Sequence, residues 1–150
     1  MRIRPANLED IQDIITLATH AVRASQWSRE QYEKALNGIP PQRLVLILEI
    51  ETNVVGFLVG RAIDHEWELE NIAVSADVHR RGLGSLILNE FLNMARQEKA
   101  EAVFLEVRES NRSARAFYEK WGFTEAGRRP RYYMQPDEDA VVYRLSIDVH

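Results

Sequence analysis

The stretch that decides the fold runs from Asn71-Ile72-Ala73-Val74 to His79-Arg80-Arg81-Gly82-Leu83-Gly84-Ser85. An apolar strand passes through a short polar turn into a basic loop with two glycines, and the loop opens directly into a helix. The first amides of a helix have no partner inside it, and they point outward at the positive end of its dipole. The two glycines allow a ligand to approach the backbone, and the two arginines add positive charge. This order predicts a site for a diphosphate.

Length and composition indicate one globular domain over residues 1–150. Apolar residues make up 45% of the chain and charged residues 28%, and no apolar run is long enough for a transmembrane helix. With no cysteine and with four histidines that show no ligand spacing, we expect neither disulfides nor a metal. The net charge of −4 argues against nucleic-acid binding. The N-terminus lacks the apolar core of a signal peptide, so we expect a cytoplasmic protein without membrane association; its oligomeric state is left open.

Hydrophobic periodicity predicts an α/β (α+β) fold. A short strand around Ile3 precedes two helices, one behind a capping box at Asn7 that runs to Val22 and one from Ser28 to near Leu36. Later elements alternate: strands are predicted over 44–50, 54–63, 67–74, 102–108, 124–127 and 140–147, and helices over 83–97 and from Ser110 or Asn111 to Trp121. This order indicates a single mixed sheet covered by helices.

Three local features are predicted within this order. The first hairpin turns at Thr52-Asn53. The last helix buries Ala114, Phe117 and Trp121 along one stripe. Trp27 lies between the first two helices, where a packing anchor is favoured over the wall of a substrate pocket.

Candidate catalytic residues lie on the strand over 102–108 and on the helix that follows it. Asn111, Arg115 and Tyr118 are spaced to share one helix face, and Glu106 lies on the strand that leads into this helix. Each residue has a structural alternative: Asn111 caps the helix, Tyr118 packs at the sheet edge, and Glu106 pairs with Arg115 or Arg108. Their combination beside a diphosphate loop favours a catalytic site.

The segment from Trp67 to Gly127 resembles the core of the GCN5-related N-acetyltransferase (GNAT) superfamily. Its acyl-CoA loop pattern, Gln/Arg-x-x-Gly-x-Gly/Ala, is matched by the residues from His79 to Gly84. His79 stands where Gln or Arg is usual, so the phosphate contact there is expected to be weaker or pH-dependent. The resemblance implies a mixed, mostly antiparallel central sheet flanked by helices, with a splayed cleft for acyl-CoA.

A narrower resemblance, to the RimI family of bacterial ribosomal-protein-alanine N-acetyltransferases, covers nearly the whole chain. It rests on Asn71-Ile72-Ala73-Val74, Leu105-Glu106-Val107-Arg108, Ser110-Asn111, Ala116-Phe117-Tyr118-Glu119, Gly122-Phe123, Trp27-Ser28 and the tail segments from Gly127 to Ala140. It implies transfer of acetyl from acetyl-CoA to the N-terminal α-amine of a protein, in the type case the alanine of a small-subunit ribosomal protein.

Roles follow from the resemblance residue by residue. Glu106 would be the general base and Tyr118 the general acid, with Glu70 on the neighbouring strand as a rival base. The implied cofactor-binding residues are Ile72, Ala73, Val74, His79, Arg80, Arg81, Gly82, Leu83, Gly84, Ser85 and Asn111. The implied substrate-binding residues are Trp27, Glu70 and Tyr133. Tyr132 and Tyr133 are placed in the loop before the last strand, where the resemblance implies contact with the peptide backbone of the substrate. The alternative, that they cover the sheet edge, is favoured for Tyr132, and the two interpretations are even for Tyr133.

The chemistry agrees with these roles. An ammonium cannot attack a thioester, and because the pKa of an α-amine is near ~7.7–8.0, a carboxylate acting through water needs to help only modestly. A phenol can protonate the departing thiolate, and a backbone amide near Val74 would hold the oxyanion. Direct attack needs no covalent enzyme intermediate, which suits a chain without cysteine.

Two other functions remain open from the sequence. The same fold could acetylate a small amine, such as an amino acid, a polyamine or an aminoglycoside. The chain could also be a non-catalytic module that binds acetyl-CoA or a partner, although the presence of Glu106, Asn111 and Tyr118 together argues against this.

Overall fold

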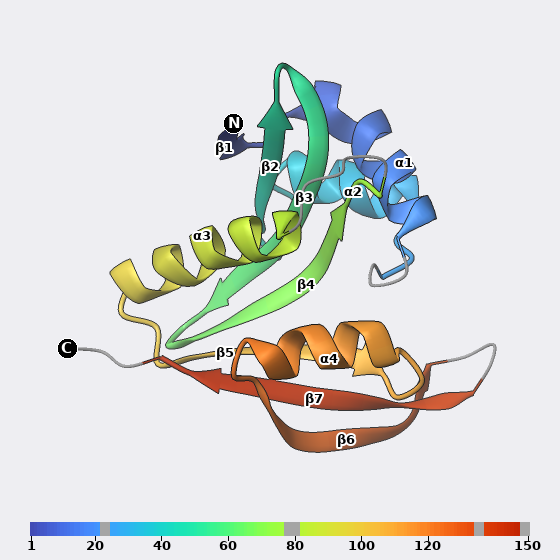
Figure 1. The fold of residues 1–150 in the computed structure, drawn as a ribbon, viewed down its shortest axis with the longest axis vertical. Coiled ribbons are helices and arrows are strands. Elements are labelled where there is room, and N and C mark those ends of the chain that lie inside the picture. The colour runs from blue at the N-terminus through green and yellow to red at the C-terminus, as the bar shows by residue number, and fades with distance from the viewer. Residues whose placement is uncertain (22–24, 77–81, 134–136, 148–150) are drawn as a thin grey trace.

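The computed structural model describes residues 1–21, 25–76, 82–133 and 137–147. The strands are β1 (Arg2–Pro5), β2 (Leu44–Ile50), β3 (Asn53–Ile63), β4 (Glu66–Val74), β5 (Ala102–Arg108), β6 (Thr124–Tyr133) and β7 (Glu138–Ser146). The helices are the 3-10 helix η1 (Leu8–Asp10), α1 (Ile11–His20), α2 (Arg29–Leu36), α3 (Leu83–Gln97) and α4 (Arg112–Lys120). The strands form one sheet in the order β1-β2-β3-β4-β5-β7-β6, in which only the β4–β5 pair is parallel (Figure 1). The expected mixed, mostly antiparallel α/β fold is confirmed.

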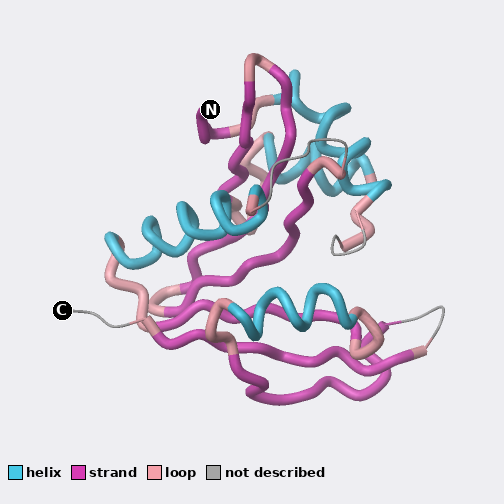
Figure 2. The backbone as a smooth tube through the Cα atoms, in the orientation of Figure 1, coloured by secondary structure: helices cyan, strands magenta, loops and turns pink. Residues whose placement is uncertain are grey.

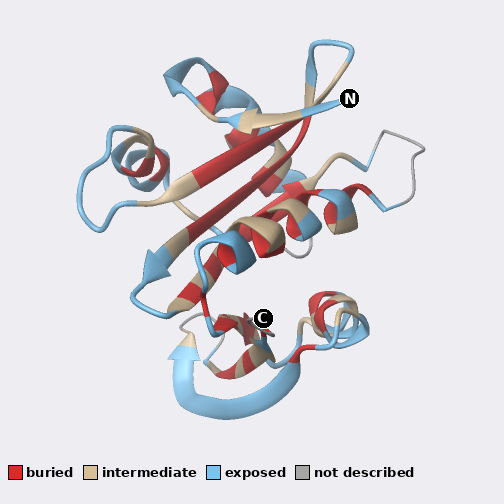
Figure 3. Ribbon diagram, turned by 90° about the vertical axis from the view of Figure 1, so that its left-hand side faces the viewer, coloured by how far each residue is buried: buried red, intermediate tan, exposed pale blue. Residues whose placement is uncertain are grey.

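The sheet is covered on both faces in its first half, from β1 to β4. Helices α1 and α2 lie on one face and α3 lies on the other (Figure 2). Apolar side chains fill both layers, so β2 and β3 contain runs of consecutive buried residues, whereas the edge strand β1 has none (Figure 3). A Cβ on Gly60 of β3 would lie 2.4 Å from the ring of Phe91, so the glycine allows α3 to pack directly on the sheet.

Helix starts follow the predicted capping boxes. Asn7 and Ser28 each accept a backbone N–H, and the side chains three residues later, Asp10 and Gln31, close the boxes. The first helical turn is a 3-10 turn, and α1 ends at His20; Val22 lies outside the described residues.

The first hairpin turns one residue earlier than predicted, at Glu51-Thr52 rather than at Thr52-Asn53. Glu51 and Thr52 have positive φ angles of 50° and 68°, and Ile50 pairs directly with Asn53. A two-residue loop with two positive φ angles matches the right-handed twist of the flanking strands. Strand β3 therefore begins at Asn53.

Strand β6 runs from Thr124 to Tyr133, which is longer than the predicted 124–127. All of its residues except Tyr133 are exposed, so no apolar alternation marks it in the sequence (Figure 3). Tyr132 and Tyr133 therefore belong to a strand, and their placement in the following loop was wrong. Of the helices described, none has the length and apolar character needed to cross a membrane.

Candidate active site

A cleft opens where β4 and β5 separate. The two strands pair in parallel at three positions: Glu66↔Ala102, Trp67↔Val103 and Glu68↔Phe104. Within the described part of the chain, no pairing joins the strands beyond Glu68 and Phe104, and they diverge from there (Figure 1). A strand edge that faces a cleft can bind an extended ligand through its backbone amides and carbonyls.

Strand β4 contains a bulge at Glu70. Its neighbours Leu69 and Asn71 pair with consecutive residues of β3, which leaves Glu70 as an extra residue. A bulge bends the strand and changes the direction of the side chains that follow. Leu69 and Ile72 accordingly pack in the same core cluster although they are three residues apart, which a regular strand does not allow.

A cavity of about 520 Å³, the central cavity, lies in the cleft. Its walls come from the segment before α2, from β4 and β5, from the start and middle of α4, and from the end of β6. Predicted site residues that line it are Trp27, Glu70, Ile72, Glu106, Asn111, Tyr118 and Tyr133. The structure thus brings the predicted base, its rival, the predicted acid and all the predicted substrate residues into one cavity.

Glu106 extends from the middle of β5, and its side chain is 13% exposed. It forms an ion pair with Arg129 of β6, with Nε of the arginine 3.0 Å from Oε1. This observed partner, Arg129, is not one of the two arginines, Arg108 and Arg115, that the sequence suggested. Arg108 pairs with Glu138 at 3.0 Å, and Arg115 donates to the hydroxyl of Tyr143 at 3.0 Å.

Glu70, the rival base, is held more tightly. Arg43 donates to both carboxylate oxygens, from Nε at 2.8 Å and from Nη2 at 3.2 Å. The side chains of both residues are largely buried. A carboxylate held by two charge-assisted hydrogen bonds is less available to accept a substrate proton than one held by a single ion pair. This contrast favours Glu106 as the base.

Glu68 also lines the central cavity and was missed from the sequence. Burial raises the pKa of its carboxyl group, and the hydrogen bond from Arg61 at 2.8 Å opposes this. The available signal was its spacing of two residues from Glu70 on a predicted strand, which puts both side chains on one face. Ser25 and Gln26, which complete one wall, carried no such signal.

Tyr118 is buried on the inner face of α4, packed between Phe117 and Phe123. The prediction that Ala114, Phe117 and Trp121 form the buried stripe was therefore wrong in part. Ala114 is buried, whereas Phe117 and Trp121 are only partly buried against the core. The reason is that α4 lies beside a cleft, so Phe117 lines a cavity and the Trp121 indole donates to Ser85 Oγ at 3.1 Å.

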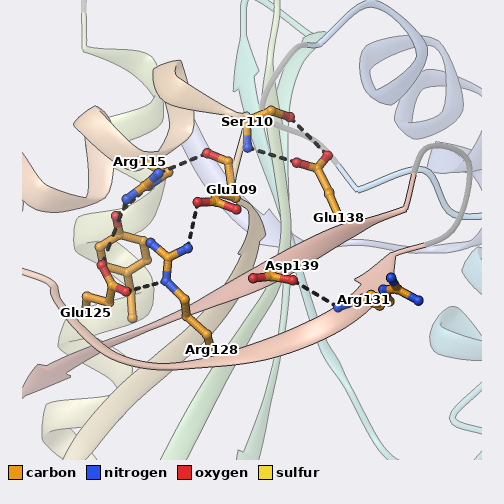
Figure 4. Close-up of polar contacts among 9 residues, drawn as sticks. Glu109, Ser110, Arg115, Glu125, Arg128, Arg131, Glu138 and Asp139 are labelled. Carbon is orange, nitrogen blue, oxygen red and sulfur yellow. Dashed lines mark hydrogen bonds and ion pairs between the residues drawn. The ribbon is translucent and has the colours of Figure 1, made fainter.

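Asn111 caps α4, since its side chain accepts the N–H of Ala114 at 3.2 Å, and it also lines the central cavity. The loop before it is fixed by Glu138 of β7, which accepts the N–H and the hydroxyl of Ser110, both at 3.0 Å (Figure 4). The hydrogen bond from Arg108, followed by these two bonds from Ser110, holds the pKa of Glu138 below its usual range. The capping end of α4 is thus attached to the β6–β7 hairpin.

Two aromatic residues, Trp27 and Tyr133, line the central cavity. The Tyr133 ring lies 4.4 Å from the Arg108 guanidinium, and burial, followed by the charge of Glu106, raises the pKa of Tyr133 to about 12. Trp27 packs on Tyr32 with ring centroids 5.3 Å apart and also faces the cavity. Trp27 therefore packs on a helix and lines this cavity as well, and its contact with substrate stays a prediction.

Several of the predicted cofactor residues line two further cavities, of about 280 Å³ and about 750 Å³. The smaller one shares Ile72 with the central cavity, and the larger one shares Val74 and Gly84 with the smaller one. The first contains Ile72, Ala73, Val74 and Gly84, and the second contains Val74, Gly82, Leu83, Gly84 and Ser85. Gly82 has a φ of 84°, which favours glycine, and as the N-cap residue of α3 it has no side chain that could cap the helix. The predicted contacts of His79, Arg80 and Arg81 lie outside the described residues.

The fold and the cleft are those expected of the GNAT superfamily, and comparison with known families gives the same class. The chain matches the model of the acetyltransferase (GNAT) family over residues 8–123, and it belongs to this family. Members of this class take their acetyl group from acetyl-CoA, and the chain is an N-acetyltransferase.

Particular relatives narrow the class. The ribosomal protein bS18-alanine N-acetyltransferase of Salmonella typhimurium is 36% identical over 129 residues, which are 84% of each chain. The crystal structure of the ribosomal-protein-S18-alanine N-acetyltransferase from Escherichia coli matches with a TM-score of 0.84 at 29% identity, over 99% of this chain and 95% of that one. Ard1 from Thermoplasma volcanium also matches with a TM-score of 0.84, at 26% identity over 97% of each chain.

Proposed function

We propose that the chain transfers acetyl from acetyl-CoA to the N-terminal α-amine of a protein, with the N-terminal alanine of a small-subunit ribosomal protein as its substrate. The observation that carries the proposal is that Glu106 and Tyr118 reach the same cavity from β5 and α4. The names of the Salmonella typhimurium and Escherichia coli relatives support the choice of acceptor. We take residues 1–150 as one catalytic domain that acts in the cytoplasm, where ribosomal proteins are made, without a metal, nucleic acid or membrane.

In this mechanism Glu106 accepts a proton from the acceptor ammonium through a water molecule. The neutral amine attacks the thioester carbon, and a backbone amide of β4 near Val74 donates to the oxygen that becomes negative. The carbon–sulfur bond then breaks, and the phenol of Tyr118 protonates the departing thiolate. The attacking nitrogen gives up its second proton in this step, and that proton restores the phenol. Each turnover transfers one acetyl group and releases one proton to solvent.

The backbone of Ile72–Val74 would bind the pantetheine arm, because this part of β4 faces the cleft and contributes to all three cavities. The start of α3 at Gly82–Ser85 would bind the diphosphate, together with His79–Arg81. Asn111 would contact the cofactor from the start of α4.

A small polycationic amine is a second candidate acceptor, because three carboxylates, those of Glu68, Glu70 and Glu106, line the central cavity. Each of these carboxylates has an arginine partner, so the amine would replace a guanidinium group as the opposite charge. This candidate differs from the first in one respect: a small amine does not need Tyr133, whereas a peptide that passes the end of β6 does.

The test measures acetyl-CoA consumption with short peptides that begin with Ala, Ser or Met, beside an N-blocked peptide that contains lysine. The Ala peptide should be acetylated and the blocked peptide should not. Glu106→Gln and Tyr118→Phe should each lower kcat about 10²-fold or more, because each removes a proton-transfer group. Arg128→Gln, on the outer surface of β6, is the control that keeps full activity.

Turnover on a polyamine but on no peptide would replace the proposed acceptor with the small amine. Binding of acetyl-CoA without turnover on any amine would indicate a non-catalytic module.

A further inference from the structure

Asn71 follows the bulge in β4 and is buried, with a relative exposure of 3%. All of its amide groups are used. Oδ1 accepts the N–H of Ser25 at 2.8 Å, and Nδ2 donates to the carbonyl of Ser25 at 3.1 Å and to the hydroxyl of Tyr32 at 2.8 Å. A buried amide with all its bonds formed fixes the groups around it, because breaking any one bond leaves an unsatisfied polar atom.

The two bonds to Ser25 attach a segment without regular structure to the sheet. Asn71 binds both backbone groups of one residue, as a neighbouring strand would, and Ser25 Oγ adds a bond to the carbonyl of Glu70 at 3.2 Å. The attached residues Ser25, Gln26 and Trp27 form one wall of the central cavity. The position of this wall relative to β4 therefore depends on Asn71.

A second path returns from the wall to β4. Tyr32, which accepts from Asn71, packs against Trp27, and the Arg43 guanidinium lies 5.2 Å from the Trp27 ring. Arg43 in turn binds Glu70, the residue before Asn71. Both sets of contacts lead to adjacent residues of β4, Glu70 and Asn71. The wall is therefore held at one end through Ser25 and at the other through Trp27.

We propose that Asn71 is a positioning residue for the acceptor: it holds the Ser25–Trp27 wall against β4 and so sets the affinity for the acceptor peptide. The inference rests on the proposed function and adds a positioning residue to the same site. Asn71 directly precedes Ile72, whose backbone is proposed to bind the acyl donor. Two adjacent residues of β4 thus have separate roles: the backbone of Ile72 positions the acyl donor, and the side chain of Asn71 positions the wall that contacts the acceptor.

The kinetic test compares Asn71→Ala and Asn71→Asp with wild type on the Ala-starting peptide. Asn71→Ala should raise KM for the peptide about tenfold, since two bonds to the wall are lost, with kcat and the Kd for acetyl-CoA within about twofold. Asn71→Asp keeps the shape and the bond to the Ser25 N–H, and makes the contact with the Ser25 carbonyl repulsive; it should raise KM in the same direction. Tyr32→Phe is the matched control, because it keeps both Ser25 bonds, and its KM should stay within about twofold.

A second measurement does not depend on the substrate. The amide of Ser25 should exchange with solvent faster in Asn71→Ala than in wild type, by hydrogen exchange under conditions where both proteins are folded. A loss of kcat at unchanged peptide KM, an equal loss of acetyl-CoA binding, unchanged Ser25 exchange, or an equal KM effect from Tyr32→Phe would each overturn the proposal. Absence of peptide turnover in wild type would contradict the proposed function alone; Asn71 is then judged by Ser25 exchange and by KM for the amine that is acetylated.

Discussion

The carboxylate that the proposed reaction needs already has a cation beside it. Arg129 pairs with Glu106, and the two side chains differ in exposure, 57% for the arginine and 13% for the glutamate. The Arg129 guanidinium also lies 5.2 Å from the Tyr132 ring, on the exposed end of β6. An exposed guanidinium leaves its partner with little loss of free energy. The acceptor arrives as an ammonium, so it has to compete with Arg129 for Glu106.

Arg129→Gln should therefore lower the KM for the acceptor peptide about threefold, because an exposed ion pair contributes about 0.2–1 kcal/mol. Initial rates against peptide concentration measure this. Arg128→Gln is the matched control, since Arg128 pairs with Glu109 and Glu125 instead. If KM rises in Arg129→Gln and not in the control, Arg129 binds the acceptor rather than competing with it.

Single residues were predictable where a motif carried them. Glu106, Asn111 and Tyr118 were identified from the strand–helix pattern, and they do meet in one cavity. Glu68 was missed because no motif contains it, and its place in the cavity depends on how β4 and β5 separate. The guanidinium partners, Arg129 for Glu106 and Arg43 for Glu70, come from distant segments that spacing along the chain does not connect.

At the scale of the element, the start of α3 depends on Gly82. Its φ of 84° strains any residue with a Cβ, although the space around it is open. Gly82→Ala should lower the free energy of unfolding by about 1–2 kcal/mol and weaken acetyl-CoA binding, because the first amides of the helix would be reoriented. Urea unfolding and calorimetric titration with acetyl-CoA measure the two effects.

Gly127→Ala is the control for this prediction. Gly127 also has open space around it but has no positive φ, so the substitution should change neither stability nor acetyl-CoA binding appreciably. Full acetyl-CoA affinity in Gly82→Ala, with stability reduced, would mean that the start of α3 does not hold the diphosphate.

Elements with strong apolar patterns were predicted to the residue, as α3 over 83–97 and β5 over 102–108 show. Two kinds of element were not. Strand β6 is exposed on both faces, so its sequence has no alternation to detect. Helix α4 lies beside a cleft, so an apolar residue such as Phe117 faces a cavity, and hydrophobicity alone does not reveal which side is buried.

At the scale of the whole molecule, the site exists because two neighbouring strands of the sheet, β4 and β5, separate after three paired positions. Strands β1–β4 and β5–β7 remain joined by three parallel pairs, and the cleft lies between the diverging ends (Figure 1). Both sides of the cleft must be rigid for the facing groups to stay in register. The β6–β7 hairpin is tied to the start of α4 through Glu138, and the N-terminal side is tied together at its far edge by Arg4.

The contacts of Arg4 at the β1 edge of the sheet lead to a prediction about how the stability of the fold depends on pH. Arg4 of β1 forms an ion pair with Glu49 of β2 and donates two hydrogen bonds of 2.8 Å to Asp10, at the start of α1. These bonds are the main cause of a pKa of Asp10 below its ordinary 3.8. The folded protein therefore binds this proton less readily than the unfolded chain does. The stability that Asp10 contributes is present above pH 3.8 and is lost as the pH falls through the folded-state pKa.

Asp10→Asn should lower the free energy of unfolding at pH 7 by about 1–3 kcal/mol, because a buried charged partner of Arg4 is removed. The difference from wild type should shrink as the pH falls from 3.8 through the lower folded-state pKa, where Asp10 of the folded wild-type protein becomes protonated as well. Urea unfolding at pH 7 and near pH 3 measures both values. Asp13→Asn, an exposed carboxylate one turn along α1, should change stability by less than about 0.5 kcal/mol at either pH. A difference between Asp10→Asn and wild type that stays constant with pH would show that Asp10 stabilises the fold through its shape and not through its charge.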